Sequence, residues 1–101
     1  MNSRAKGARG ERELANKLKE YGFDCRRGQQ YCGANGDADL PGIHIECKRV
    51  ERSNISDATS QAICDAKNGE KPVVFHRKDN EKWLVTMQLS DFIEIYKEWD
   101  I

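Results

Sequence analysis

The stretch IHIECKRV, which begins at Ile43, constrains the fold more than any other part of the sequence because its apolar and polar residues alternate. Alternation predicts a strand with one buried face, since successive side chains of an extended chain point to opposite sides. The apolar face runs from Ile43 to Cys47, and the other face carries His44, Glu46 and Lys48. A carboxylate and an ammonium group are therefore expected side by side on a strand that the core anchors.

A first helix is expected over residues 3–21, because apolar residues recur there at helical spacing and form one stripe, namely Leu14, Ala15, Leu18 and Tyr21. Gly22 should end this helix as a C-cap. Glu11 falls on the same stripe and should face inward, where a carboxylate needs a partner. The alternative is a half-exposed Glu11 that favours the helix dipole or pairs with Arg4 or Lys19.

The segment between this helix and the strand at Ile43 contains few apolar residues. FDCRR, at residues 23–27, predicts a short strand, and GQQYCGANGDA predicts a loop without a packed face of its own. Pro41 and Gly42 form a turn pair between extended segments, which predicts a hairpin or tight bend before Ile43.

The second half of the chain predicts two more helices and two more strands. One helix should be capped by Ser56 and stop at Asn68-Gly69, and the closing helix, SDFIEIYKEWD, should be capped by Ser90. The strands PVVFHR and KWLVTMQL should be joined by the turn KDNE, with both tryptophans in the core. The predicted fold class is α/β, a central mixed β-sheet flanked by helices, with the strand at Ile43 inside the sheet.

Composition limits the number of domains and the kind of partner. The 101 residues suit one domain, and the 17 Lys and Arg residues balance the 17 Asp and Glu residues, so no strong overall field identifies a partner. The charge is nevertheless uneven. Residues 1–27 carry eight Lys or Arg and four acidic residues, whereas residues 91–101 carry four acidic residues and one lysine.

The cysteines indicate a reducing compartment. The four cysteines form no C-x-x-C pair, their spacing with the two histidines matches no familiar zinc pattern, and no apolar leader precedes them. We expect reduced thiols and a cytoplasmic location. No run approaches the roughly 18 apolar residues that would span a membrane.

The turn before the strand predicts a site for a hard cation. Asp37 and Asp39 precede the turn, and a tight bend would bring a carboxylate back toward Glu46. Carboxylate oxygens are the ligands that Mg²⁺ prefers, and a neighbouring Lys48 would orient or deprotonate an attacking water. Glu13, on a more solvent-directed helix face, is a lesser candidate. The alternative is an aspartate that caps the turn beside a structural ion pair between Glu46 and Lys48.

The pattern D-x6-E-x-K, written here as ADLPGIHIECK behind a helix with an inward glutamate, resembles the PD-(D/E)XK nuclease superfamily. KGARGERELANKLKEYGFDCRR resembles the archaeal Holliday-junction resolvases of that superfamily. The second half of the chain is similar to small phage-borne resolvase-like nucleases. The resemblance covers nearly the whole chain. It implies a restriction-endonuclease-like core of α-β-β-β-α-β, followed by a strand and a helix. It also implies that the protein acts in a bacterial or archaeal cell.

The resemblance implies roles for specific residues. The acid of the first helix falls on Glu11, the central aspartate on Asp39, and the E-x-K pair on Glu46 and Lys48, with the backbone carbonyl of Cys47 as a further metal ligand. Ala38 replaces the proline of the superfamily pattern, so Asp37 is a rival metal ligand. His44 and Gln61 are expected beside the site without a direct role in the chemistry.

The implied activity is Mg²⁺-dependent hydrolysis of phosphodiester bonds in branched DNA, with Mn²⁺ as a substitute ion and a four-way junction as substrate. Paired incisions imply a homodimer. Basic residues are expected to contact DNA phosphates, namely Arg4, Lys6, Arg9, Arg12, Arg27 and Arg49. A monomeric nickase of ordinary duplex and a DNA-binding module that keeps the nuclease fold without turnover are the alternatives.

Overall fold

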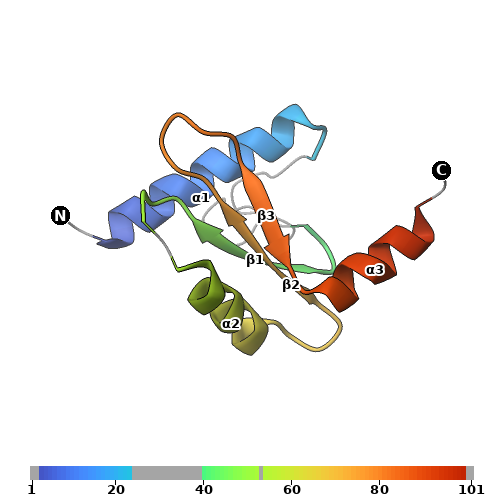
Figure 1. Ribbon diagram of the computed structural model, residues 1–101. Coiled ribbons are helices and arrows are strands. Elements are labelled where there is room, and N and C mark those ends of the chain that lie inside the picture. Colours follow the sequence, from blue (N-terminus) through green and yellow to red (C-terminus); the bar gives the residue numbers. More distant parts are fainter. Residues whose placement is uncertain (1–2, 24–39, 53, 100–101) are drawn as a thin grey trace.

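The computed structural model describes residues 3–23, 40–52 and 54–99. These residues form a small α/β fold with a three-stranded mixed sheet and three helices (Figure 1). This confirms the α/β class predicted from the sequence. None of the helices in the described part of the chain is both long and apolar enough to cross a membrane.

The sheet has the strand order β1-β2-β3, formed by Ile43–Lys48, Lys71–His76 and Leu84–Met87. β1 and β2 are parallel, with Ile43 opposite Lys71, whereas β2 and β3 are antiparallel. Among the described residues β1 is an end strand of the sheet. That β1 is an inner strand stays a prediction, because residues 24–39 lie outside the described residues. A further strand was expected at residues 23–27; Phe23 is not in a strand, and residues 24–27 lie outside the described residues.

The turn before β1 follows the sequence prediction. Gly42 has a φ of +85°, a conformation that glycine adopts without steric cost, and the Ile43 amide donates to the Leu40 carbonyl at 3.0 Å. This bend starts β1 in the register that directs Ile43 and Ile45 to the apolar core.

Helix α1, Ser3–Glu20, covers one face of the sheet. Leu14 is 2% exposed and packs with Val73 and Phe75 of β2, and the apolar residues of β1 join this cluster. The helix ends at Glu20, and Gly22, with a φ of +99°, follows as the predicted C-cap glycine, with its amide donating to the Lys19 carbonyl. The predicted stripe is one residue too long, however, because Tyr21 is 72% exposed.

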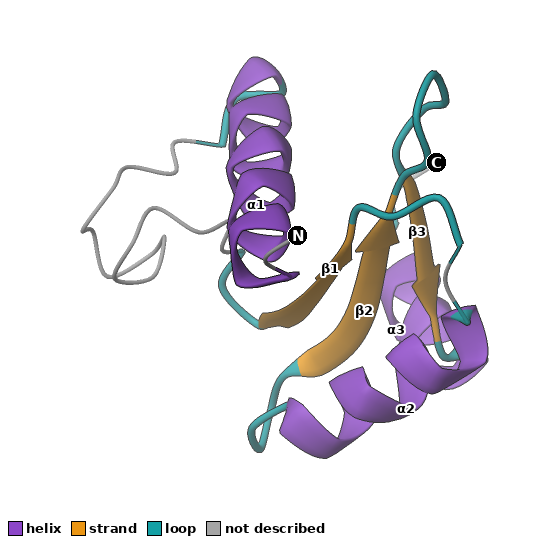
Figure 2. Ribbon diagram, turned by 90° about the vertical axis from the view of Figure 1, so that its left-hand side faces the viewer, coloured by secondary structure: helices purple, strands orange, loops and turns teal. Residues whose placement is uncertain are grey.

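Helix α2, Ile55–Asp65, covers the opposite face, as Figure 2 shows. Ala58 and Ala62 pack against Val74, so small side chains bring this helix close to the sheet. The predicted cap at Ser56 is wrong. Asn54 is the N-cap, because its side chain accepts a hydrogen bond from the Asp57 amide at 3.0 Å.

Helix α3, Leu89–Glu98, extends away from the sheet (Figure 1) and has no buried residue. Its N-cap is Gln88, so the predicted cap, Ser90, lies within the helix. Trp99, predicted to be a core residue, is 63% exposed, whereas Trp83 packs against the core as expected. The closing helix was predicted correctly, but no described element covers its apolar residues.

Candidate functional site

The polar face of β1 carries the pair predicted from the sequence. Lys48 Nζ lies 3.8 Å from Glu46 Oε2, which confirms that the two side chains share a face. The Glu46 side chain is 18% exposed and that of Lys48 is 39% exposed. The pair is thus accessible from solvent but rests on a rigid strand, a placement that suits a chemical site better than a mobile surface pair does.

Two further side chains join Glu46 on this face. His44 Nε2 lies 3.7 Å from Glu46 Oε1, and a carboxylate oxygen of Asp65 completes a group of three ligand-type atoms within 4.8 Å of one another. Asp65 is the last residue of α2, so two elements build the cluster. Gln61, predicted to lie beside the site, is exposed and donates a hydrogen bond to Asp65 Oδ2 at 2.8 Å.

Sequence reasoning missed Asp65, although a signal was present. Ala58, Ala62 and Asp65 recur at positions i, i+4 and i+7, which place them on one face of a helix. Because Ala58 and Ala62 pack on the sheet, Asp65 is directed toward the same sheet at the end of the helix. His44, which was expected near the site without a direct role, belongs to the same cluster.

The apolar face of β1 meets α1 at Gly10. A Cβ atom at Gly10 would lie 2.6 Å from the Cβ atom of Arg49 and 3.8 Å from Cys47 Sγ, so only glycine permits this approach. The close crossing brings Glu11 and Glu13 to the carboxyl end of β1.

The Cys47 thiol shows how many acidic groups surround this crossing. Its pKa is raised to about 12, mainly by burial and then by the negative charges of Glu11, Glu13 and Glu46, whereas Lys48 lowers it less. Glu11 and Glu46 thus act on one thiol from α1 and from β1. The predicted convergence of Glu11, Asp39 and Glu46 on one ion stays a prediction, because Asp37 and Asp39 lie outside the described residues.

Glu13, predicted to face solvent, instead joins three segments of the chain. Its Oε1 accepts a hydrogen bond from Arg49 Nε at 3.0 Å and another from Arg77. Arg49 also pairs with Asp79, at 2.8 Å from NH2 to Oδ1. The hydrogen bonds to Asp79 and Glu13 raise the pKa of Arg49 above its ordinary value. The sequence gives no local sign of this network, because Glu13 and Arg77 are 64 residues apart.

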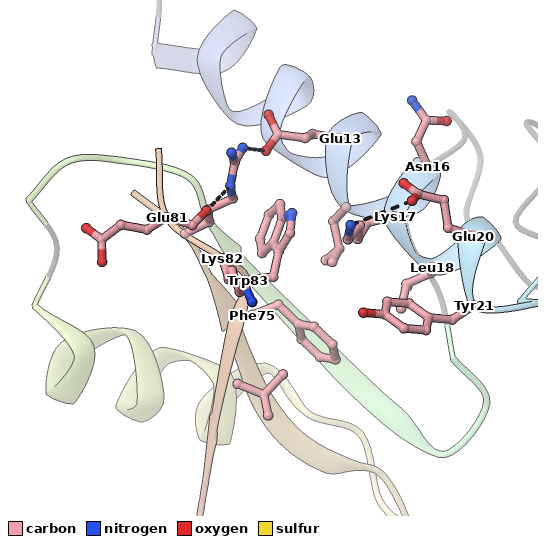
Figure 3. Close-up of a pocket in the computed structure, with 13 residues that line it drawn as sticks. Glu13, Asn16, Lys17, Leu18, Glu20, Tyr21, Phe75, Glu81, Lys82 and Trp83 are labelled. Atoms are coloured by element: carbon pink, nitrogen blue, oxygen red, sulfur yellow. Dashed lines mark hydrogen bonds and ion pairs between the residues drawn. The ribbon is translucent and has the colours of Figure 1, made fainter. Parts of the chain in front are cut away.

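A cavity of about 780 Å³ opens between α1 and the connection from β2 to β3 (Figure 3). Trp83 and Phe75 line it from the sheet side, and Leu18 of α1 and Tyr21 of the turn after it line the opposite side. Its charged lining residues are mixed in sign, with Lys17, Arg77 and Lys82 against three glutamates. Neither Glu46 nor Lys48 lines this cavity. Their side chains alternate along β1 with Ile45 and Cys47, which pack in the cluster of Leu14, so the predicted pair is on the other side of the sheet.

The basic residues predicted to contact DNA have different environments. Arg9 and Arg12 are exposed on α1, and Arg4 and Lys6 belong to the first turns of the same helix. Arg27 lies outside the described residues. Arg49, in contrast, has a 19% exposed side chain whose charge is already paired within the protein.

Comparisons of this chain with protein-family models, with curated proteins and with solved structures found no match. The resemblance to the PD-(D/E)XK superfamily therefore depends on the sequence motifs. The geometry of β1 is an independent observation about the same residues.

Proposed function

We propose that this protein is a metal-dependent endodeoxyribonuclease that hydrolyses phosphodiester bonds of branched DNA in the cytoplasm. The observation that supports the proposal best is the pair of Glu46 and Lys48, which are 3.8 Å apart on one face of a strand. The proposal includes a restriction-endonuclease-like core, in which β1 is the strand that carries the E-x-K motif.

The donor atoms around Glu46 suit a cation. Its side chain is only 18% exposed. One of its oxygens lies within 4.8 Å of ligand-type atoms of His44 and Asp65, so an ion could bind between them. Glu46, Asp39 and the carbonyl of Cys47 would hold Mg²⁺, or Mn²⁺ in its place, with Glu11 nearby. The bound ion would supply positive charge that stabilises the phosphate during hydrolysis.

Lys48 would act on the attacking water. Its ammonium group is anchored by Glu46 yet remains 39% exposed, so it can reach a water beside the scissile phosphate. The Lys48 ammonium would orient this water by donating a hydrogen bond to it, while Glu46 keeps the lysine in position.

The exposed basic residues of α1 would hold the DNA backbone. Arg9 and Arg12 are exposed and can contact phosphates, and we extend this surface to Arg4, Lys6 and Arg27 by sequence. Arg49 is left out of the surface, because Glu13 and Asp79 already neutralise it.

A homodimer would supply the two active sites that paired incisions require. The apolar face of α3, formed by exposed residues, suits an interface with a second copy: Leu89, Phe92, Ile93, Ile95, Tyr96 and Trp99. Strand β3 ends the described sheet beside it, and Leu84 and Val85 of this strand are also exposed. A C2 homodimer would use this same patch on both subunits.

The second candidate is a DNA-binding module without turnover. The observation that favours it is the position of Glu46, which lies within ion-pair distance of both His44 and Lys48 and so has structural partners. In this case the E-x-K motif would stabilise the strand and perform no chemistry.

Cleavage assays of Lys48→Ala separate the two candidates. With Mg²⁺ and junction, flap, duplex and single-stranded substrates, the wild-type protein should cleave branched DNA fastest. Lys48→Ala should lose on the order of 100-fold or more in rate, because one preorganised charge contact is worth about 3 to 4 kcal/mol in the transition state. Its affinity for the junction should stay close to that of the wild type.

Lys67→Ala is the matched control, since Lys67 is an exposed lysine outside the pair. It should cleave at the wild-type rate. Folded Lys48→Ala protein that cleaves as fast as Lys67→Ala would refute the mechanism. Wild-type protein that binds the junction but cleaves no substrate would support the DNA-binding module instead.

A further inference from the structure

His44 has a ring nitrogen that the fold leaves without a hydrogen-bonding partner. In the described part of the chain, Nε2 is buried and makes no hydrogen bond, although its nearest acidic neighbour, Glu46 Oε1, lies 3.7 Å away. A buried polar atom without a partner is costly, and such atoms in native proteins commonly face a water or an ion. The nitrogen therefore indicates a ligand in the space between His44 and Glu46.

The geometry around this nitrogen suits a small cation. His44, Glu46 and Asp65 each offer one ligand atom, and all three atoms lie within 4.8 Å of one another. Bonds of about 2.0 to 2.2 Å from nitrogen or oxygen allow ligand atoms at most roughly 4.4 Å apart, so small side-chain rotations would close the group around one ion. Two of the ligands come from β1 and the third from the end of α2, which the packing of Ala58 and Ala62 fixes against the sheet.

The electrostatic field at this position also favours a cation. Two carboxylates face the space, and α2 directs its carboxyl end, the negative end of the helix dipole, toward it. The last turn of α2 has no basic residue that would cancel this field. Lys48 opposes cation binding, but it lies beside Oε2 of Glu46, while His44 lies beside Oε1.

We propose that His44, Glu46 and Asp65 bind a divalent transition-metal ion through Nε2 and one oxygen of each carboxylate. An imidazole ligand selects ions such as Zn²⁺, Ni²⁺ and Co²⁺ over Mg²⁺ and Ca²⁺, which prefer oxygen alone. Three protein ligands leave coordination positions for water or for an anionic group. The site shares Glu46 with the proposed nuclease centre, but it does not depend on nuclease activity.

Titration of the metal-free protein with Co²⁺ tests the site directly. Visible absorption and calorimetry should show saturable binding of one ion, without the strong near-ultraviolet band that thiolate ligands produce. Because Cys64 precedes Asp65 and is exposed, the titration is repeated in Cys64→Ser, which should bind Co²⁺ as the wild type does.

His44→Ala and Asp65→Asn should each weaken Co²⁺ binding at least tenfold. Asp57→Asn is the matched control, because it removes a carboxylate from the first turn of the same helix and should leave binding unchanged. Circular dichroism establishes that each variant is folded. Wild-type protein without saturable binding would overturn the proposal, as would His44→Ala and Asp65→Asn that bind as tightly as Asp57→Asn.

Lys48→Ala distinguishes this site from the proposed function. Removal of the nearby positive charge should tighten Co²⁺ binding several-fold, whereas the same variant should lose DNA cleavage. Unchanged or weaker Co²⁺ binding in folded Lys48→Ala would contradict the proposed electrostatics of the site. Because Co²⁺ binding is measured without DNA, its failure leaves the proposed nuclease intact, and the absence of cleavage leaves the metal site intact.

Discussion

The two faces of the sheet are built from the same strands but are completed in different ways. On the face that α1 covers, Leu14 packs with the apolar residues of β1 and β2, and the charges of Glu13 are paired with two arginines. On the face that α2 covers, small alanines pack on Val74 and leave the polar side of β1 partly open. The α1 face thus holds the main apolar core and paired charges, and the α2 face keeps charged groups close together and accessible.

The two faces of β1 thus have different roles: its apolar side chains contribute to stability, and its polar side chains form the candidate site. On the α1 face, apolar packing and guanidinium–carboxylate hydrogen bonds stabilise the folded state, so substitutions there should lower the free energy of unfolding. Glu46, His44 and Asp65 place two carboxylates around a buried nitrogen, an arrangement that favours ligand binding over stability. Substitutions on the two faces should therefore give opposite patterns of effect.

The largest loss of stability is expected for Leu14→Ala on the α1 face. Leu14 is 2% exposed in the main core cluster, so truncation should cost about 2 to 5 kcal/mol of unfolding free energy. Denaturant unfolding measures this loss. Ile63→Ala, at a 44% exposed position of α2, is the control, and an equal loss there would contradict the comparison of the two faces.

Glu13→Gln should have the next largest effect. The neutral amide can no longer pair with Arg49 and Arg77, and charged hydrogen bonds of this kind are worth about 1.5 to 3 kcal/mol. Glu20→Gln is a matched control, because Glu20 pairs only with the exposed Lys17, at 3.6 Å among the described residues. In chemical denaturation, Glu13→Gln should have a clearly lower free energy of unfolding than Glu20→Gln. Equal values would show that the network of Glu13 with Arg49 and Arg77 does not stabilise the fold.

Gly10→Ala should destabilise the protein although alanine favours helices. The new methyl group would lie 2.6 Å from the Cβ atom of Arg49, and overpacking of this kind costs about 1 to 3 kcal/mol, more than the roughly 1 kcal/mol gained in helix propensity. Thermal unfolding against Asn16→Ala, an exposed position of the same helix, measures the difference. A variant more stable than the wild type would show that α1 does not approach β1 so closely.

The smallest change in stability is expected for Lys48→Ala. The pair with Glu46 spans 3.8 Å and the lysine is well exposed, so its loss should cost only about 0 to 1 kcal/mol. A loss similar to that of Leu14→Ala would mean that the E-x-K pair stabilises the fold. Together with the cleavage assay, this measurement decides whether the α2 face serves chemistry or structure.

The elements and faces of this fold were largely predictable, because they depend on local patterns. Strict alternation placed Glu46 and Lys48 on one face, and helical spacing identified the buried position of Leu14. The turn at Gly42 was predictable because its φ of +85° needs glycine. In each case the deciding interaction lies within a few residues of the motif.

The contacts between distant segments were not predictable. The pairing of Glu13 with Arg77 depends on how α1 crosses the sheet, and the position of Asp65 depends on where α2 ends relative to β1. Periodicity also identifies an apolar face without showing what covers it, which is why Trp99 was wrongly placed in the core. The predicted carboxylate partners of Glu46, Asp37 and Asp39, lie outside the described residues.

The parallel pairing of β1 with β2 also has a consequence for the order of folding. β2 and β3 are joined by a short connection, so their antiparallel hairpin can form within microseconds. β1 can pair with β2 only after α2 has closed the intervening loop, a step that costs more chain entropy. During synthesis α1 and β1 leave the ribosome before β2, so the apolar side chains of β1 stay exposed until β2 is available to pair with it. Slow translation through α2 would prolong this exposed state, and synonymous codons in that stretch would therefore influence the yield of folded protein.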